Sequence, residues 1–396
     1  MDHGGGILLG LFVIFVAAQA GAEIAQRLKL PGVVGEIAVG CVLGPSALGW
    51  VHPSEALDLL AEIGVVLLLF SVGLETKLEE MKRVGRSAFF VGVLGVVVPF
   101  VLGSLWARGS GFEWAQSMFV AAAFVATSAG ITARVLQELG VLQRQESRVI
   151  LGAAVIDDVL AMLLLGIVTA LQSGESLHLG QIVLILAESI GFIAVIVFLG
   201  TKVMQRQSHW LEAPINPLSP LTLALALCLG LAFLATQFGL AAIIGAFLAG
   251  MIASETKQRE TIEHQTQPLL AFLTPFFFVL TGSKVELTQL ADAGTLLTLA
   301  LITAIAIVSK LLGGFVGALS LGKRGALIVG VGMVPRGEVG VVIAALGLAA
   351  GVFSAHTYAL IVAMSLLTSV VTPPVLAMLF KADARERLEA ADRPAA

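Results

Sequence analysis

Apolar runs of about 20 residues recur along the whole chain, and short polar loops separate them. Each run is long enough for an α-helix to cross the roughly 30 Å hydrocarbon core of a bilayer. Because lipid offers the backbone no hydrogen bonds, a spanning segment must be a helix or part of a closed barrel. Of the 396 residues 58% are hydrophobic and 13% are charged, whereas soluble domains carry about 25% charged residues. The sequence therefore predicts an all-α polytopic membrane protein.

We expect about thirteen transmembrane helices. Helices 218–237 and 239–254 meet at a very tight turn near Phe238 and Gly239. The expected helices cover residues 6–26, 32–49, 56–74, 87–107, 114–136, 147–171, 181–203, 218–237, 239–254, 262–282, 294–319, 325–350 and 356–379.

The positive charges of the loops predict the orientation. With the first helix running inward, the loops on the outside hold only Arg108 and Lys284, and almost all of the 23 Lys and Arg residues fall on the inside. Lys310 and Arg336 lie within spans. We therefore expect an integral protein of the bacterial inner membrane with its N-terminus outside and its C-terminus in the cytoplasm.

Two of the expected helices are interrupted. Residues 126–130 (ATSAG) form a small, polar interruption in helix 114–136, and residues 332–338 (GMVPRGE) place Pro and Gly inside helix 325–350. With helix 181–203 as a linker, each break falls in the fifth helix of one half. An odd linker gives the halves opposite orientations, which predicts an inverted repeat with its site where the discontinuous helices meet. Gly and Pro are also common in membrane helices, so a coincidence of two breaks is the alternative.

Two adjacent carboxylates, Asp157 and Asp158, lie in the apolar run 147–171. Counted from Arg148 at its polar edge, Asp157 lies roughly 14 Å deeper, near the middle of the bilayer. A carboxylate at that depth costs at least ~2.5 kcal/mol and usually lines an ion or proton path. The alternative is an acid that only pairs with a Lys or Arg for packing. Lys310, in the middle of span 294–319, is the expected partner of Asp157.

The breaks supply further polar groups. Thr127 and Ser128 offer oxygens, and Arg336 and Glu338 are placed to offset the partial charges of the half-helix ends in their own helix. Neighbouring residues project about 100° apart on a helix, so only one of the paired aspartates can face the site. Protonation of a carboxylate competes with cation binding to the same oxygens, and that competition is the minimal chemistry of antiport.

Three stretches resemble the NapA-type sodium/proton antiporters of the monovalent cation:proton antiporter-2 family. They are ATSAGITARVLQELG at 126–140, GAAVIDDV at 152–159 and PRGEVG at 335–340. The resemblance spans nearly the whole chain. It implies an electrogenic exchange of protons for sodium or lithium by an elevator-type alternating-access mechanism. It also implies Asp158 as the main ligand of sodium, Asp157 beside it and paired to Lys310, and Thr127 and Ser128 lining the crossing.

The resemblance further implies a homodimer in membrane lipid. A dimerisation scaffold would take residues 1–84 and 211–292, and a transport domain 85–175 and 293–380. Residues 176–210 would be the linker and 381–396 a short cytoplasmic tail with no soluble regulatory domain. We expect no cofactor beyond the transported ions, and no nucleic-acid partner.

Two other functions are weighed against this one. A potassium/proton exchanger of the same family remains open, because sequence does not measure the size of a cavity. An intramembrane aspartyl protease needs two Asp that converge from different helices on one water, whereas Asp157 and Asp158 are adjacent on one helix. We therefore expect a secondary transporter and no enzyme. Glu75 is either a guard of the cytoplasmic mouth or a loop acid near Lys77.

Overall fold

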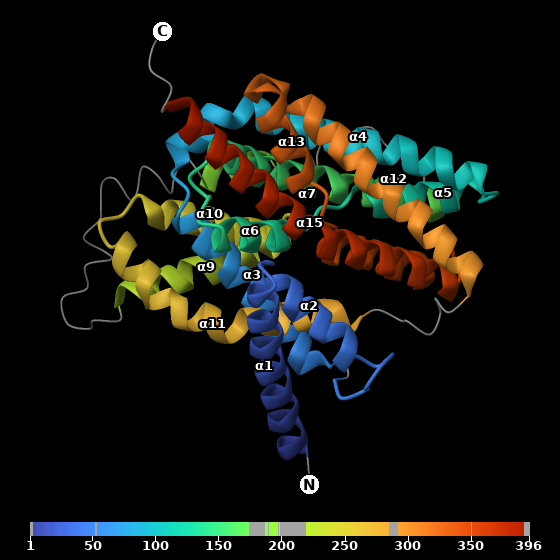
Figure 1. The fold of residues 1–396 in the computed structure, drawn as a ribbon, viewed down its shortest axis with the longest axis horizontal. Helices are drawn as coiled ribbons and strands as arrows, with labels where there is room; N and C mark the ends of the chain where they lie inside the picture. Colours follow the sequence, from blue (N-terminus) through green and yellow to red (C-terminus); the bar gives the residue numbers. More distant parts are fainter. Residues whose placement is uncertain are drawn as a thin grey trace.

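The computed structural model describes residues 3–51, 54–173, 187–188, 190–196, 198, 219–284, 292–349 and 351–391. The regular structure of these residues is helical, which confirms the all-α prediction (Figure 1). In this part of the chain, 8 helices are long and apolar enough to cross a membrane. Most of the expected span 181–203 lies outside the described residues.

The described helices follow the expected spans, with both breaks at the expected places. Their bounds are α1 (His3–Arg27), α2 (Gly32–Leu43), α3 (Glu55–Leu74), α4 (Leu78–Gly109), α5 (Trp114–Val125), α6 (Ala129–Glu138), α7 (Gln145–Ser173), α9 (Ser219–Gln237), α10 (Ala242–Ser254), α11 (Arg259–Ser283), α12 (Ala293–Gly317), α13 (Gly322–Gly332), α14 (Glu338–Ala349) and α15 (Ala355–Ala391), with a 3-10 turn at Leu319–Leu321.

Three helix ends lie far from their predicted positions. Helix α2 ends at Leu43 and not near residue 49, because Pro45 disfavours the α conformation of Gly44, which is extended with ψ of 171°. Helix α4 begins at Leu78 and not at 87, and α15 continues to Ala391. Both extensions are rich in Glu, Lys, Arg, Ala and Leu, which favour helix, so the helices continue beyond their apolar parts.

The helices pack mainly in two sets (Figure 1). In the first, α1 lies on α2, α2 and α3 lie on α11, and α3 and α9 lie on α10. In the second, α4 lies between α7 and α12, and α5, α13, α14 and α15 complete the set. Helix α6 lies between the sets: it contacts α3 and α2 of the first and α7 and α15 of the second. The two sets therefore meet along a seam formed by α2 and α3 on one side and α6 and α15 on the other.

Two backbone-to-backbone crossings hold the first set together. In the crossing of α2 with α11, a Cβ added to Gly40 would lie 2.1 Å from the carbonyl oxygen of Val279. In the crossing of α3 with α10, a Cβ added to Gly250 would lie 2.1 Å from the oxygen of Phe70. Only glycine fits at such a distance. Each crossing joins a helix of one repeat to a helix of the other.

Candidate functional site

The two broken helices cross at their connectors. Ser128, between α5 and α6, donates its backbone N–H to the oxygen of Pro335, between α13 and α14, at 2.8 Å. The Ser128 side chain also caps α6 by accepting from the N–H of Ile131. Gly337 passes so close that an added Cβ would lie 2.4 Å from Ser128 Oγ. The crossing therefore depends on a glycine on one connector and a small capping residue on the other.

Asp157 and Lys310 form an ion pair beside this crossing. The Lys310 ammonium donates to Asp157 Oδ1 at 2.5 Å and to the carbonyl oxygens of Gly95 and Val125 at 2.7 Å each. An ammonium has three protons, so all its donors are used. The other Asp157 oxygen, Oδ2, accepts from the backbone N–H of Thr127 at 3.1 Å. Asp157 thus joins α7, α12 and the first break, and both charged side chains are fully buried.

Arg336 is also fully buried. Its guanidinium donates to the carbonyl oxygens of Val125, at 2.9 Å, and Ala306, at 3.0 Å. Two cations, Arg336 and Lys310, therefore cover the C-terminal end of α5, where the partial charge of the helix is negative. This differs from the expectation that Arg336 offsets charge in its own broken helix, because the crossing brings the end of α5 against the second connector. The side chain of Glu338 lies outside the described residues.

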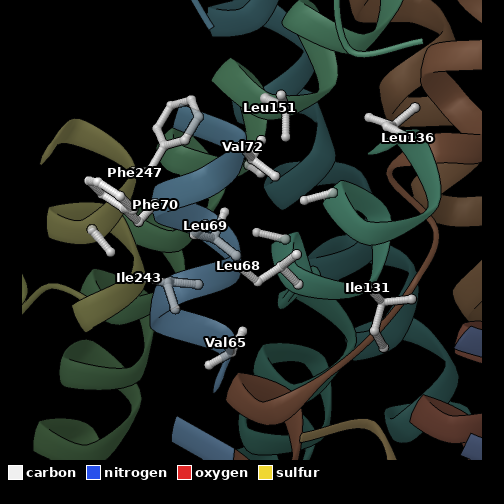
Figure 2. Packing of buried hydrophobic residues seen from close by; sticks show 14 of the residues in the cluster. Val65, Leu68, Leu69, Phe70, Val72, Ile131, Leu136, Leu151, Ile243 and Phe247 are labelled. Atoms are coloured by element: carbon white, nitrogen blue, oxygen red, sulfur yellow. The ribbon is translucent and has the colours of Figure 1, made fainter. Parts of the chain in front are cut away.

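Asp158 points elsewhere. It is buried and lines a narrow cavity of about 10 Å³ between α3, α6, α7 and α10. Figure 2 shows part of its apolar wall, with Leu69 on α3, Leu151 on α7, and Ile243 and Phe247 on α10. A space of ~10–15 Å³ holds one water molecule, so the cavity has the scale of a single small ion or water. The two adjacent aspartates therefore face different surroundings, as the helical spacing requires.

The hydroxyl of Thr127 is buried beside the crossing without a hydrogen-bond partner among the described residues. Most buried hydroxyls on the helices instead donate to a carbonyl one turn back, as Thr266 and Thr274 do. An unpartnered buried hydroxyl is costly, and a cation bound beside it would take up its lone pairs. Among the described residues, no cluster of three His, Cys, Asp or Glu could hold a metal ion.

Several groups that hold the site together were not predicted from the sequence. The carbonyls of Gly95, Val125 and Ala306 carry no sequence signal, because any residue has a carbonyl. Thr132 donates to the oxygen of Gly332 at the end of α13, at 3.0 Å. Thr368 and Ser369 on α15 contact the backbone of Arg336. A signal for this pair exists, because hydroxyl residues on one face of an apolar helix point to a buried backbone that needs partners.

The comparisons with known proteins point to one family of transporters. The family model "Sodium/hydrogen exchanger, transmembrane" matches residues 11–382. The High-affinity Na(+)/H(+) antiporter NhaS3 of Synechocystis sp. is 35% identical, over 98% of this chain and 92% of its own. The Na(+)/H(+)-K(+) antiporter GerN of Bacillus cereus is 34% identical, over 93% of this chain and 95% of its own.

The structure of the sodium proton antiporter MjNhaP1 from Methanocaldococcus jannaschii aligns with a TM-score of 0.70 at 18% identity, over 96% of this chain and 98% of that one. This likeness shows a shared fold. The family match covers nearly the whole chain, including both breaks and the buried ion pair. The protein is a transporter and not an enzyme, and it belongs to the sodium/hydrogen exchanger family.

Proposed function

We propose that this chain is a NapA-type antiporter that exchanges protons for sodium or lithium. One observation carries the proposal: a buried Asp157–Lys310 ion pair lies at the helix crossing, and Thr127, with its free hydroxyl, is tied to that same Asp157. Asp158 faces its own small cavity from the next position of α7. In this proposal the side chains of Asp157, Asp158 and Thr127 supply the oxygen ligands of a small cation, and Lys310, paired to Asp157, is the proton-carrying group.

The cycle proceeds by competition. In the proposed cycle, Asp158 loses its proton and binds sodium as the main ligand. The positive ion draws the Asp157 carboxylate away from Lys310. The ammonium, left without its counter-ion in a buried site, gives up its proton. Return of protons to Lys310 and Asp158 restores the pair and releases sodium. Two protons then move against one sodium ion, so the exchange is electrogenic.

An elevator motion of one helix set against the other would carry the site across the membrane. Cavities of about 420 Å³ at both ends of the seam support this proposal. Gly32 and Glu138 line one of them, and Ser283 and Tyr358 line the other.

Cross-linking the two helix sets tests the motion. A thiol cross-linker between Ser71→Cys and Gln137→Cys, whose wild-type side chains are 3.2 Å apart across the seam, should stop exchange. A control cross-link between Thr76→Cys and Ser254→Cys, within the first set, should not. Both pairs need Cys41→Ser and Cys228→Ser; equal transport after the two cross-links would refute the elevator.

The proposed assembly is a homodimer in the cell membrane, with the first helix set at its interface and the C-terminus in the cytoplasm. Its support is that exposed apolar side chains such as Leu8 and Phe12 cover α1 of that set. Light scattering of the purified protein in detergent should give the mass of a dimer. Accessibility of a C-terminal protease site in intact and lysed cells tests the orientation.

Proteoliposomes test the exchange. With a proton gradient reported by a pH-sensitive dye, adding sodium or lithium should collapse the gradient, and adding choline should not. The charge moved per proton, measured as current on a supported membrane, should show net charge movement. Absence of any sodium-dependent proton flux in pure, folded protein would refute the proposal.

Potassium/proton exchange is the second candidate. Its support is GerN, whose name includes potassium and which is 34% identical to this chain. The same liposomes decide between the candidates: a gradient that collapses with potassium at concentrations where sodium has no effect favours the second. Equal responses to both ions would make the chain a transporter of both.

A further inference from the structure

Helix α15 carries a face of buried hydroxyls that the proposed cycle does not use. Ser365, Thr368, Ser369 and Thr372 are all buried. Their spacing of three, one and three residues places them along one side of the helix. The helix is otherwise apolar at this level, so the face needs a physical explanation.

Two of these hydroxyls reach the second break in addition to lying within hydrogen-bond distance of the Ser365 carbonyl in their own helix. Thr368 Oγ1 accepts from the backbone N–H of Arg336 at 3.1 Å. Ser369 Oγ donates to the backbone carbonyl of the same residue. The other two stay within α15: Ser365 donates to Ile361 O at 2.9 Å, and Thr372 donates to Thr368 O at 2.6 Å. The reach to the connector is therefore specific to the middle pair.

A helix break in the membrane leaves backbone groups without helical partners, and burying them unpaired is costly. Thr368 and Ser369 satisfy both polar backbone groups of Arg336, so its main chain is fixed at two points. The guanidinium of Arg336 donates to the carbonyl of Val125, which also accepts from Lys310. A contact chain therefore runs from α15 through Arg336 to the ion pair.

The first break is held by a different kind of group. There the connector N–H, that of Thr127, is bound by the Asp157 carboxylate. Helices α7 and α15 occupy corresponding places in the two repeats, since each follows a broken helix. A carboxylate changes its charge and partners when it binds a proton or a cation, whereas Ser and Thr hydroxyls keep theirs at working pH. The group that holds the first connector is thus titratable, whereas the two hydroxyls that hold the second are not.

We propose that Thr368 and Ser369 are positioning residues of the antiporter, which keep the second break and the Arg336 guanidinium in one geometry while the first break rearranges. The inference rests on the proposed function and extends it, because it assigns the moving part of the site to the connector around Thr127. Neither hydroxyl touches the cation; each acts through Arg336.

Thr368→Val tests the proposal, with Thr372→Val as the matched control. Both remove one buried hydroxyl at nearly constant volume from the same face, but Thr372 bonds only within α15. In proteoliposomes, Thr368→Val should raise the KM for sodium about two- to tenfold, the range that corresponds to one hydrogen bond. The pH at which exchange by this variant is half-maximal should also move, by about half a unit. Thr372→Val should keep the wild-type KM and profile, and Thr368→Ser should restore both.

Ser369→Ala is an independent test, because it removes the hydroxyl that binds the Arg336 carbonyl and leaves the one that binds the N–H. It should shift the KM for sodium and the pH profile of exchange in the same direction as Thr368→Val. If Thr368→Val and Ser369→Ala lower only the melting temperature, or match Thr372→Val in every transport measurement, the hydroxyls merely pack and the inference is wrong. Wild-type flux is measured first. Its absence would overturn the antiport proposal itself, which separates that failure from a failure of this inference.

Discussion

At the level of single residues, the site separates two acids that the sequence makes neighbours. Asp157 is engaged by Lys310 and by the Thr127 N–H, whereas Asp158 lines the cavity by α10. The Lys310 ammonium has no donor left for Asp158. The two side chains are therefore expected to respond very differently to neutralisation.

Asp158→Asn should abolish exchange and leave the protein folded, because it removes the proton acceptor and the ligand charge without breaking the ion pair. Its melting temperature in detergent should stay within a few degrees of wild type, since it adds no volume. Asp157→Asn is the comparator: it leaves Lys310 buried and unpaired, which should cost about 3–5 kcal/mol. Near wild-type sodium-driven flux in Asp158→Asn would refute the site assignment.

Lys310→Gln should leave exchange that has become electroneutral. The amide can still bond to the carbonyls of Gly95 and Val125 but cannot carry a proton. Current per proton, from supported-membrane and dye measurements on the same liposomes, should fall towards zero. If the ratio is unchanged, Lys310 only holds α7 and α12 together, and the second proton travels elsewhere.

At the level of elements, the sequence predicts the breaks well and their contacts poorly. Gly and Pro at 332–337 and the polar run at 126–130 mark the interruptions, because these residues disrupt helices locally. Which connector lies against which is set by tertiary packing. The sequence therefore could not show that Arg336 caps α5, or that Thr368 binds its N–H. The Lys310–Asp157 pair was foreseeable, since each charge needs a partner at that depth.

Gly337→Ala should disturb the crossing, because its methyl group would lie against Ser128 Oγ and Cβ, at 2.4 and 2.5 Å. Overpacking of this kind costs about 1–3 kcal/mol. Adding Ser128→Gly should restore much of the melting temperature, because it clears the space and glycine at an N-cap costs only a few tenths of a kcal/mol. Additive losses in the double variant would show that the two connectors are not in contact.

At the level of the whole molecule, the seam between the helix sets is joined at one end by polar contacts. Gln137 on α6 donates to Ser71 Oγ and to Glu75 Oε1, and Gln143 donates to the Glu75 carbonyl. Glu75 follows the last residue of α3, at the end expected to face the cytoplasm. The sequence left Glu75 either as a guard of the cytoplasmic mouth or as a loop acid near Lys77, and the structure adds a role that neither interpretation names: a contact that joins the two helix sets.

Glu75 should make stability depend on pH. Partial burial raises the pKa of its carboxyl above the ordinary 4.5; the Gln137 hydrogen bond opposes the shift, and the Glu263 charge adds to it. The folded protein therefore holds this proton at pH values where the unfolded chain has released it, and stability falls as pH rises from 4.5 through the raised value. Glu75→Gln keeps an oxygen that accepts from Gln137 but has no group that titrates.

The melting temperature of Glu75→Gln should therefore fall less than that of wild type across this window, and the two should converge at the acid end. Parallel curves for wild type and Glu75→Gln would show that this carboxyl is not linked to folding.

The glycine crossings of the first helix set have a consequence for biosynthesis. Gly40 and Gly73 lie in the N-terminal half, and their partner helices α11 and α10 emerge from the ribosome much later. Until then the glycine faces of α2 and α3 are exposed to lipid, because the helices that pack against them have not yet been made. The N-terminal half should therefore stay protease-sensitive when expressed alone. Two fragments divided between residues 176 and 210 should protect each other from protease when made in the same cell, because each brings the helices that cover the other's glycine faces.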